Sequence, residues 1–349
     1  MQENIAVISL KNIRHNFTVF KKRLCAGTKF FAVVKADAYG HGAERVSETL
    51  EGLADGFVVT SVREGIALRA SGVQGEILVL TPPIGLDDAF LAAAHGLTLT
   101  VCSASALRFA AAGAEKDGKP VAVHIKVNTG MNRLGLCGAP LKKLFSLAER
   151  TDGVRVRGIY SHLYAPADAE ASDAQRRIFE STAEEAKDRF GGIVCHLAAT
   201  GGTLAGQRFH FDGVRIGIGL YGYLPGGFEG FAPALGLRPA MRLYTHVLQS
   251  HRFTGGGVGY ARADGADYGD LTVCRLGYAD GFLRSGGGGR LRAIGNLCMD
   301  GCVRQGRAKS GQRRAVFFSA DKVAEDCKTI SYEVLCAAAK RAVKIYEEC

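Results

Sequence analysis

Lys35 is the residue whose surroundings most clearly suggest chemistry. It lies in the run VVKADAYGHG, at the end of an apolar segment that has the composition of a buried β-strand. A lysine flanked by apolar strand residues is costly to keep protonated, so its pKa should fall and its amine should become nucleophilic. Such amines form Schiff bases with carbonyl compounds. Tyr39 follows directly and would lie in the loop above Lys35.

Other polar residues fall at the same place relative to predicted strands. The segment 128–133 follows the fifth strand, His162 closes the sixth, Thr200 follows the seventh, and Gly217 and Ile218 lie in the eighth. Each has an ordinary explanation alone, since a single histidine is more often structural than catalytic. The C-terminal ends of barrel strands meet at one face, however, and that face carries the chemistry of such barrels. Together these residues therefore predict one shared site.

Eight β-rich runs support that arrangement. They are almost continuously apolar and alternate with amphipathic segments, as parallel strands buried on both faces do. The strands are predicted at residues 30–36, 56–61, 76–80, 97–103, 121–128, 154–163, 193–199 and 214–221. Eight strand–helix units over ~200–250 residues indicate a TIM (β/α)8 barrel. A doubly wound sheet is the alternative, but no Gly-x-Gly-x-x-Gly follows the first strand.

The pattern changes after about residue 236. Apolar and polar residues alternate over 241–253, as in half-buried antiparallel strands. Further strands are predicted at 271–276, 291–294 and 315–318, with glycine clusters at 255–257 and 286–289 and one helix at 332–343. We therefore assign residues 1–230 to the barrel and 231–349 to a mainly β C-terminal domain.

Composition narrows the class of protein. The chain has 349 residues, 47% of them hydrophobic, so it can bury a large core. Its net charge of +10 is scattered in short clusters, which favours a solvated basic surface over a nucleic-acid-binding face. No segment approaches the roughly 20 apolar residues of a membrane span, and no signal-peptide pattern opens the chain. The ten cysteines form no Cys-x-x-Cys pair, so we predict free thiols, no metal site and a soluble cytoplasmic protein.

Eight motifs, in order along nearly the whole chain, resemble those of the alanine racemases, a family of fold-type III pyridoxal-phosphate enzymes. They are VKADAYGHG (34–42), VNTGMNRLG (127–135), GIYSHL (158–163), DGVRIGIGLYG (212–222), GVGYA (257–261), GYADGF (277–282), CMD (298–300) and TISYEVLC (329–336). The resemblance implies pyridoxal 5'-phosphate as cofactor, interconversion of L- and D-alanine, a supply of D-alanine for peptidoglycan, and a homodimer.

The resemblance also implies roles for individual residues. Lys35 would hold the cofactor and act as one catalytic base, and Tyr260 of the partner subunit would be the base on the opposite face of the substrate. Arg215 would face the pyridine nitrogen of the cofactor, and Arg133 its phenolic oxygen and the substrate carboxylate. His162 would hydrogen-bond to Tyr260 or Arg215 and tune them.

The remaining implied roles concern the phosphate and the substrate. The phosphate would be held by Tyr39, Thr200, Gly217, Ile218 and Tyr346. Tyr278 and the backbone of Met299, both from the other subunit, would line the path of the substrate. Lys126 matches a lysine that some family members carry as a carbamate.

The residue types suit the chemistry. Racemisation removes the Cα proton on one face and returns one on the other, which a lysine and a tyrosine on opposite faces do directly. An arginine beside the pyridine nitrogen cannot accept its proton, so that nitrogen would stay unprotonated and side reactions would be suppressed.

The sequence departs from the family at Ala199-Thr200, where Asn-Ser is usual, at Asn132, where glycine is usual, and in a tail without Pro-Arg. Two alternatives stay open: a racemase of serine or of a wider set of amino acids, and a non-catalytic pyridoxal-phosphate-binding barrel. The second domain argues against the latter.

Overall fold

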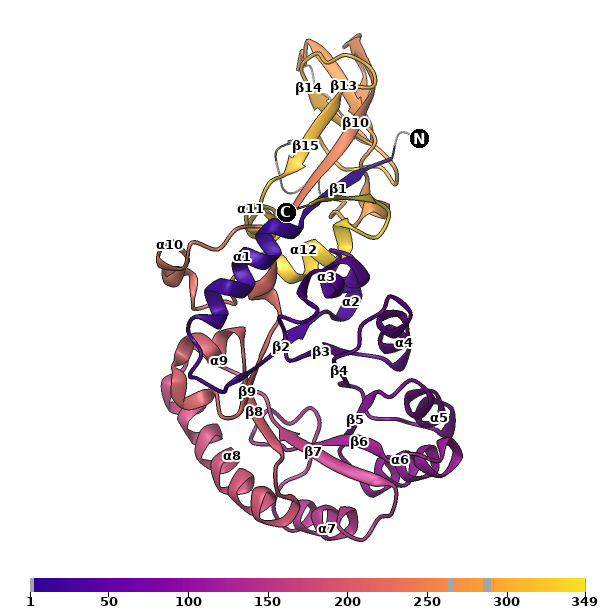
Figure 1. Cartoon of the computed structure of the whole chain (residues 1–349). Helices are drawn as coiled ribbons and strands as arrows, with labels where there is room; N and C mark the ends of the chain where they lie inside the picture. Colours follow the sequence, from indigo (N-terminus) through magenta and orange to yellow (C-terminus); the bar gives the residue numbers. More distant parts are fainter. Residues whose placement is uncertain (1–2, 263–265, 285–289, 291, 349) are drawn as a thin grey trace.

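The barrel predicted from the sequence is present in the computed structural model, which describes residues 3–262, 266–284, 290 and 292–348 (Figure 1). Eight parallel strands close into a ring in which the last pairs with the first. The strands are β2 (Lys29–Val33), β3 (Gly56–Val59), β4 (Glu76–Val79), β5 (Thr98–Val101), β6 (Val121–Lys126), β7 (Val154–Tyr160), β8 (Val194–Ala199) and β9 (Gly213–Ile216). The TIM-like barrel is confirmed.

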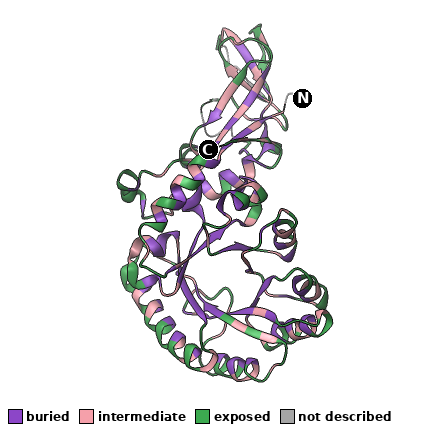
Figure 2. Cartoon of the chain, viewed as in Figure 1, coloured by how far each residue is buried: buried purple, intermediate pink, exposed green. Residues whose placement is uncertain are grey.

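Helices cover the outside of the barrel, with their apolar faces on the strands and their polar faces in solvent (Figure 2). The α-helical segments of this part are α1 (Leu10–Lys21), α2 (Lys35–Tyr39), α3 (Ala43–Leu50), α4 (Val62–Ala70), α5 (Leu86–Ala94), α6 (Ala104–Asp117), α7 (Gly138–Ala148), α8 (Ala169–Phe190) and α9 (Thr200–Ala205). Two short 3-10 turns, η1 (Gln207–Phe209) and η2 (Ile218–Tyr221), flank β9.

The second part of the chain is mainly β, as predicted. It contains β10 (Met241–Arg252), β11 (Gly257–Val258), β12 (Ala261–Arg262), β13 (Asp270–Cys274), β14 (Cys302–Gln305), β15 (Arg313–Phe317) and β16 (Val343–Glu347). Its helical segments are η3 (Glu229–Phe231), α10 (Ala232–Leu235), η4 (Tyr278–Asp280), α11 (Ala320–Asp326) and α12 (Ser331–Ala338).

The N-terminal strand lies in this second sheet, although the sequence analysis counted its residues with the barrel. β1 (Ile5–Ser9) pairs antiparallel with β10 and parallel with β16. The chain therefore starts in the sheet and enters the barrel through α1. The first and last segments of the chain are thus held side by side.

Two details of the predicted second domain differ. The helix predicted over 332–343 ends at Ala338, because the β-branched and aromatic tail forms the edge strand β16 instead. Described residues 292–294 of the strand predicted at 291–294 are not in a strand, and Leu291 and the glycine cluster 286–289 lie outside the described residues.

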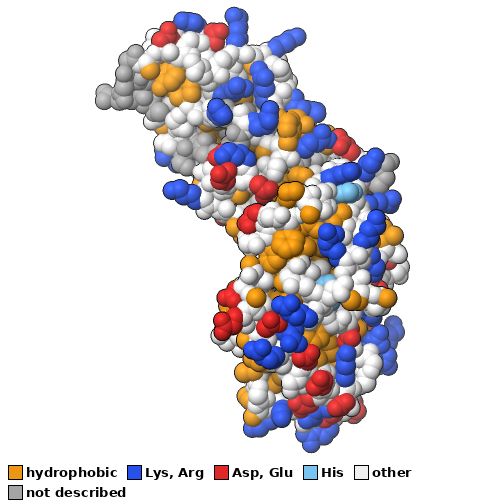
Figure 3. Space-filling view, turned by 90° about the vertical axis from the view of Figure 1, so that its left-hand side faces the viewer, with side chains coloured by type: hydrophobic (Ala, Val, Ile, Leu, Met, Phe, Trp, Pro, Cys, Tyr) orange, Lys and Arg blue, Asp and Glu red, His pale blue; other side chains and the backbone are white. Residues whose placement is uncertain are grey.

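The surface matches the scattered charge of the sequence. Lysine and arginine side chains are spread over the visible face of both parts (Figure 3). Among the described residues, none of the helices has the length and apolar character needed to cross a membrane.

Candidate functional site

Lys35 follows β2 at the C-terminal end of the barrel and opens an unusual backbone segment. The next four residues, Ala36 to Tyr39, all have φ between 52° and 54°, so α2 is a left-handed turn. The left-handed conformation costs non-glycine residues roughly 1–2 kcal/mol each. Such strain persists only where surrounding contacts impose it, and it gathers at functional sites.

Two carboxylates hold this turn. Glu64 accepts a hydrogen bond from the Ala36 backbone N–H at 2.7 Å while its other oxygen caps the start of α4 at Ser61. Asp37 accepts from the backbone N–H of Ala43 and forms an ion pair with Lys344, both at 2.8 Å. The capping box of α4 therefore also fixes the loop that carries Lys35.

The C-terminal helix closes over the same turn. A Cβ built on Gly40 would stand 2.6 Å from the Leu335 carbonyl oxygen of α12. The ring of Tyr332, at the start of α12, lies 5.9 Å from the ring of Tyr39. α12 therefore joins the second part of the chain to the Lys35 loop, and only glycine at position 40 allows this approach.

The electrostatic surroundings of Lys35 favour a neutral amine. Burial lowers the pKa of Lys35, and the charges of Arg133 and Arg215 lower it further, against the opposite effect of Glu64. The amine of a lysine with lowered pKa is nucleophilic, as the sequence suggested. Arg133 itself is exposed on the loop after β6.

A group of backbone N–H donors gathers beside this lysine. The Thr200 hydroxyl oxygen accepts from the backbone N–H groups of Gly217 and Gly219, both at 3.3 Å. The Tyr39 hydroxyl lies over Gly217, where a Cβ would come within 2.6 Å of it. Ile218 lies between the two glycines and opens η2. Tyr39, Thr200, Gly217 and Ile218, predicted as one group, are therefore close together.

Arg215 lies buried at the floor of the site. Its Nη1 donates to Nδ1 and to the backbone oxygen of His196, both at 2.9 Å. Its Nη2 donates to the carbonyl oxygens of Ser161 at 2.6 Å and Leu197 at 3.0 Å, and approaches His162 Nδ1 at 3.3 Å. Burial lowers the pKa of Arg215 to about 10, so the guanidinium keeps its charge at neutral pH.

Lys126 and His162 lie within the electrostatic influence of the two arginines. Burial, and then the charges of Arg215 and Arg133, lowers the pKa of Lys126 well below its ordinary value. Its ammonium group lies 4.4 Å from the centre of the Tyr160 ring. Burial and the charge of Arg215 also lower the pKa of His162, so its ring is neutral.

Tyr346 is not brought to the group around Thr200. Its hydroxyl lies against Gly42, and its ring faces the Arg45 guanidinium at 5.6 Å. Tyr332 is the tyrosine of the C-terminal segment that reaches Tyr39, and burial raises its pKa to about 12. Tyr332 belongs to the motif 329–336, so the sequence points to this segment as well as to Tyr346, the tyrosine predicted to contact the phosphate.

The residues expected from a partner subunit gather elsewhere. The backbone N–H groups of Tyr278 and Ala279 donate to the carbonyls of Cys298 and Met299, each at 3.0 Å, so η4 and the segment around Met299 lie together. Tyr260, between β11 and β12, is 74% exposed, Met299 55% and Tyr278 39%. In the described part of the chain, no side-chain hydrogen bond or ring contact links these three side chains to the barrel site.

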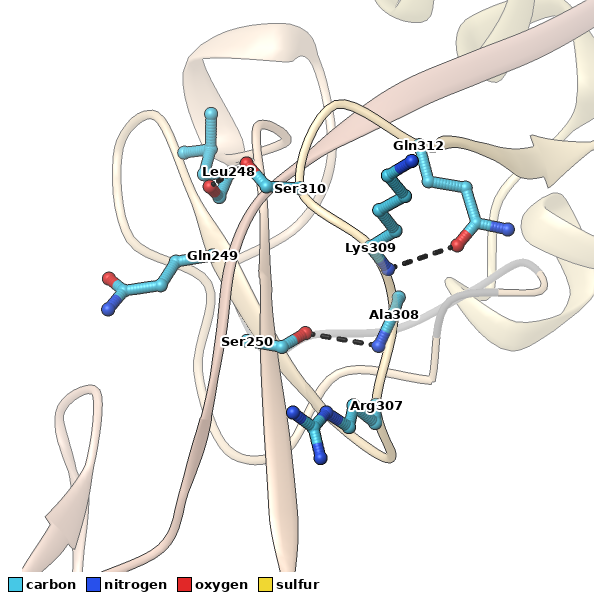
Figure 4. A pocket seen from close by; sticks show the side chains of 8 residues that line it. All are labelled: Leu248, Gln249, Ser250, Arg307, Ala308, Lys309, Ser310 and Gln312. Carbon is cyan, nitrogen blue, oxygen red and sulfur yellow. Dashed lines mark hydrogen bonds between the residues drawn. The ribbon is translucent and has the colours of Figure 1, made fainter.

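A pocket in the second part is lined by Leu248, Gln249, Ser250, Arg307, Ala308, Lys309, Ser310 and Gln312 (Figure 4). The two serine hydroxyls of this pocket form hydrogen bonds with neighbouring backbone groups: Ser250 accepts from the Ala308 N–H, and Ser310 donates to the Leu248 carbonyl. Within the described ranges, the His, Cys, Asp and Glu side chains form no group of three suited to a metal ion.

The site as a whole suits an anionic molecule with a reactive carbonyl. Lys35, Lys126, Arg133 and Arg215 act on one another electrostatically, and among the described residues Arg215 has no carboxylate within ion-pair distance. A buried cation without a counter-ion, such as Arg215, favours a bound anion. The N–H groups of Gly217 and Gly219 are the kind of donors that bind phosphate after the last barrel strands.

Comparisons with known proteins agree with this geometry. Residues 8–225 match the family model described as alanine racemase, N-terminal domain, and residues 240–346 match the alanine racemase C-terminal domain. The chain is 32% identical to the alanine racemase of Desulfovibrio desulfuricans over 371 residues, covering 98% of each.

Solved structures give the same result. The structure of alanine racemase from Clostridium difficile 630 superposes with a TM-score of 0.90 at 26% identity and covers 100% of this chain and 96% of that one. Alanine racemase from Bacillus anthracis with bound L-Ala-P gives a TM-score of 0.88 at 27% identity, covering 99% and 95%.

Proposed function

Because the chain belongs to the alanine racemase family, we propose that it interconverts L- and D-alanine with pyridoxal 5'-phosphate as its cofactor. The observation that carries the proposal is the position of Lys35: a lysine at the C-terminal end of a barrel strand whose pKa is lowered by burial and by the charges of Arg133 and Arg215, and which lies at the same end of the barrel as the N–H groups around Thr200. The Bacillus relative with bound L-Ala-P supports an alanine-like ligand at this site.

The residues present fit this cofactor. Lys35 would bind its aldehyde carbon, and the N–H groups of Gly217, Ile218 and Gly219, with the hydroxyls of Tyr39 and Thr200, would hold its phosphate. When bound, pyridoxal phosphate supplies the electron sink that makes the Cα proton of an amino acid removable. Arg215 would then face the pyridine nitrogen as a hydrogen-bond donor that cannot take a proton from it.

We assign the two proton transfers to Lys35 and Tyr260. Lys35 would take or return the proton on one face of Cα, and the Tyr260 hydroxyl of the partner subunit on the other. Two facts support a partner: Tyr260, Met299 and Tyr278 are exposed, and they lie on the second part of the chain. The enzyme would therefore act as a homodimer in which each site takes residues from both chains.

Arg133 would orient the substrate. It lies near enough to Lys35 to lower the pKa of that lysine, and guanidinium groups bind carboxylates through paired hydrogen bonds. Placing the substrate carboxylate on Arg133 would fix Cα between the two bases. His162, neutral and beside Arg215, would tune that arginine or Tyr260. Lys126 would act on Arg133, either as the amine or as a carbamate.

The experiment is a chiral assay on purified protein saturated with pyridoxal phosphate. L-alanine should be converted to an equal mixture of both enantiomers, and D-alanine to the same mixture. The same assay with serine tests the wider racemase function: a kcat/KM for serine equal to that for alanine would show a broad specificity, and a higher one would make serine the preferred substrate. A protein that binds the cofactor but converts no amino acid would be a non-catalytic carrier. Alanine turnover would place the enzyme in the cytoplasmic supply of D-alanine for peptidoglycan.

A further inference from the structure

Four polar side chains form a continuous chain through the interior of the barrel. Glu76 Oε1 lies 3.2 Å from His124 Nε2, His124 Nδ1 lies 2.9 Å from His196 Nε2, and His196 Nδ1 lies 2.9 Å from Arg215 Nη1. Glu76 opens β4 at the N-terminal end of the barrel, whereas Arg215 lies at the opposite end, in the site. The chain therefore connects the floor of the site to the far end of the barrel.

The hydrogen-bonding capacities of the four groups allow one arrangement of protons. Arg215 can only donate, so Nδ1 of His196 must accept and its proton must be on Nε2. His124 Nδ1 must then accept from His196, which leaves the His124 proton on Nε2, facing Glu76. Both rings are therefore neutral, and the Glu76 carboxylate is the acceptor at the end of the chain.

The surrounding residues hold both rings in place. His124 and His196 are fully buried. A Cβ on Gly158 would stand 2.7 Å from His124 Cε1, so a glycine there makes room for the ring. The His196 ring stacks between Phe31 and Tyr160, with centroids 5.2 and 5.1 Å away. The rings cannot turn without disturbing this packing.

The surroundings of Glu76 favour its ionised carboxylate form. Burial alone would raise the pKa of Glu76, but its contacts with His124, Thr98 and Lys29 together outweigh that effect and lower the pKa. Glu76 Oε1 and His124 Nε2 are both buried and approach each other to 3.2 Å, a polar contact that falls short of ideal hydrogen-bond geometry, and neither atom has a hydrogen bond to another described residue. If Glu76 were absent, the His124 N–H would have no acceptor, and the ring would favour the proton on Nδ1. That proton would oppose the Nε2 proton of His196.

We propose that Glu76 and His124 are positioning residues for Arg215: they stabilise the tautomer of His196 whose Nδ1 accepts from the guanidinium, and so help to hold Arg215 toward the site. The inference rests on the proposed function only for its effect on catalysis. It extends the set of residues that govern the reaction to a carboxylate at the other end of the barrel.

Three variants separate this role from a general loss of stability. Glu76→Leu removes the acceptor, and Glu76→Gln keeps a carbonyl oxygen that can accept from His124. Glu51→Leu is the matched control, because Glu51 accepts from the backbone N–H groups of Gln74 and Gly75 at the same end of β4, each at 3.1 Å. It has no contact with the histidine pair.

Two measurements are made on each protein. The first uses nitrogen-15 histidine spectra of cofactor-free protein, which distinguish a proton on Nδ1 from one on Nε2, with His124 and His196 assigned by substitution. The second uses steady-state kinetics of the loaded enzyme. Wild type should carry the His196 proton on Nε2.

In Glu76→Leu the spectra should no longer show the His196 proton only on Nε2. The kcat of this variant should fall about tenfold, as is usual when a residue that supports a site residue from behind is lost, while KM should change less than about twofold. Glu76→Gln and Glu51→Leu should retain the wild-type tautomer and kcat.

A His196 proton on Nδ1 in wild type would overturn the inference without any variant, and so would wild-type spectra and kcat in Glu76→Leu. Wild type that binds cofactor but racemises no amino acid would instead refute the proposed function, and the spectra of the cofactor-free protein would still decide the role of Glu76.

Discussion

The Tyr39 hydroxyl lies over the α-carbon of Gly217, so close that a Cβ there would stand 2.6 Å from the phenolic oxygen. Gly217 has φ −109°, a value that other residues also adopt. Space, and not backbone conformation, is therefore the reason for glycine at this position. The contact joins the loop after β2 to the segment after β9, which are neighbours across the closure of the barrel.

Gly217→Ala should weaken cofactor binding without unfolding the protein. The new methyl group would displace the Tyr39 hydroxyl, and overpacking of this kind costs ~1–3 kcal/mol. Affinity for pyridoxal phosphate should therefore fall about tenfold or more, as measured by absorbance titration. Gly230→Ala is the control, because a Cβ on Gly230 meets nothing within 4 Å. Equal affinities of the two variants for pyridoxal phosphate would show that Tyr39 and Gly217 do not contribute to the phosphate site.

Thr200→Val should lose cofactor affinity, whereas Thr203→Val should lose only stability. Both threonines are buried and both valines are nearly isosteric. The Thr200 hydroxyl oxygen accepts hydrogen bonds from the N–H groups of Gly217 and Gly219. The Thr203 hydroxyl instead donates to the Ala199 carbonyl. Each lost hydrogen bond should cost about 1 kcal/mol in urea unfolding. An equal loss of affinity in both variants would argue against a specific role for Thr200.

Lys126→Met should change how stability depends on pH. Burial, together with the charges of Arg215 and Arg133, lowers the pKa of Lys126 in the folded protein below its ordinary value of 10.5. At pH values between the lowered pKa and 10.5, Lys126 is therefore protonated in the unfolded chain but not in the folded protein. The free energy of unfolding should therefore rise with pH in that window, by ~1.4 kcal/mol per pH unit.

The variant should lack this contribution and should be more stable than wild type at neutral pH. The measurement is urea unfolding of cofactor-free protein in carbon-dioxide-free buffer from pH 7 to 10, with the exposed Lys142→Met as control for the lost charge. Identical slopes in wild type and Lys126→Met would contradict a lowered pKa of Lys126 in the folded protein.

The sequence predicted the barrel well because most of its strands are apolar on both faces, a pattern that does not depend on long-range contacts; β7, with exposed Arg155 and Arg157, is the exception. Lys35, Thr200 and Gly217 could be placed at one face of the barrel because they stand at or near the ends of predicted strands. Tyr39 could be placed with them because it lies only four residues after Lys35, whereas the roles of these residues stay predictions.

Other features depend on tertiary contacts that no local pattern carries. The left-handed turn after Lys35 is imposed by Glu64 and Asp37, and its alanines give no local sign of it. The histidine at position 196 stands in a run that reads as an ordinary buried strand, and its function follows from its neighbours across the barrel. The pairing of β1 with β10 joins residues more than 200 positions apart.

A mixing experiment tests whether each site is built from two chains. Lys35→Ala and Tyr260→Phe should each lose at least about a hundredfold in kcat, since each lacks one base. Mixed dimers of the two variants contain one site with both residues intact, so random reassociation should restore about a quarter of wild-type activity. A mixture as inactive as its components would mean that Lys35 and Tyr260 act within one chain, or that Tyr260 is not a base.

Exchange of the Cα hydrogen in heavy water tests the central claim most directly. Protein loaded with pyridoxal phosphate is incubated with L-alanine or D-alanine, and Cα deuterium and configuration are followed by NMR and chiral chromatography. The two-base account predicts deuterium in the product enantiomer from either starting material, at rates that fall together in Tyr260→Phe. Absence of exchange with every amino acid tested, in protein shown to bind the cofactor, would contradict it.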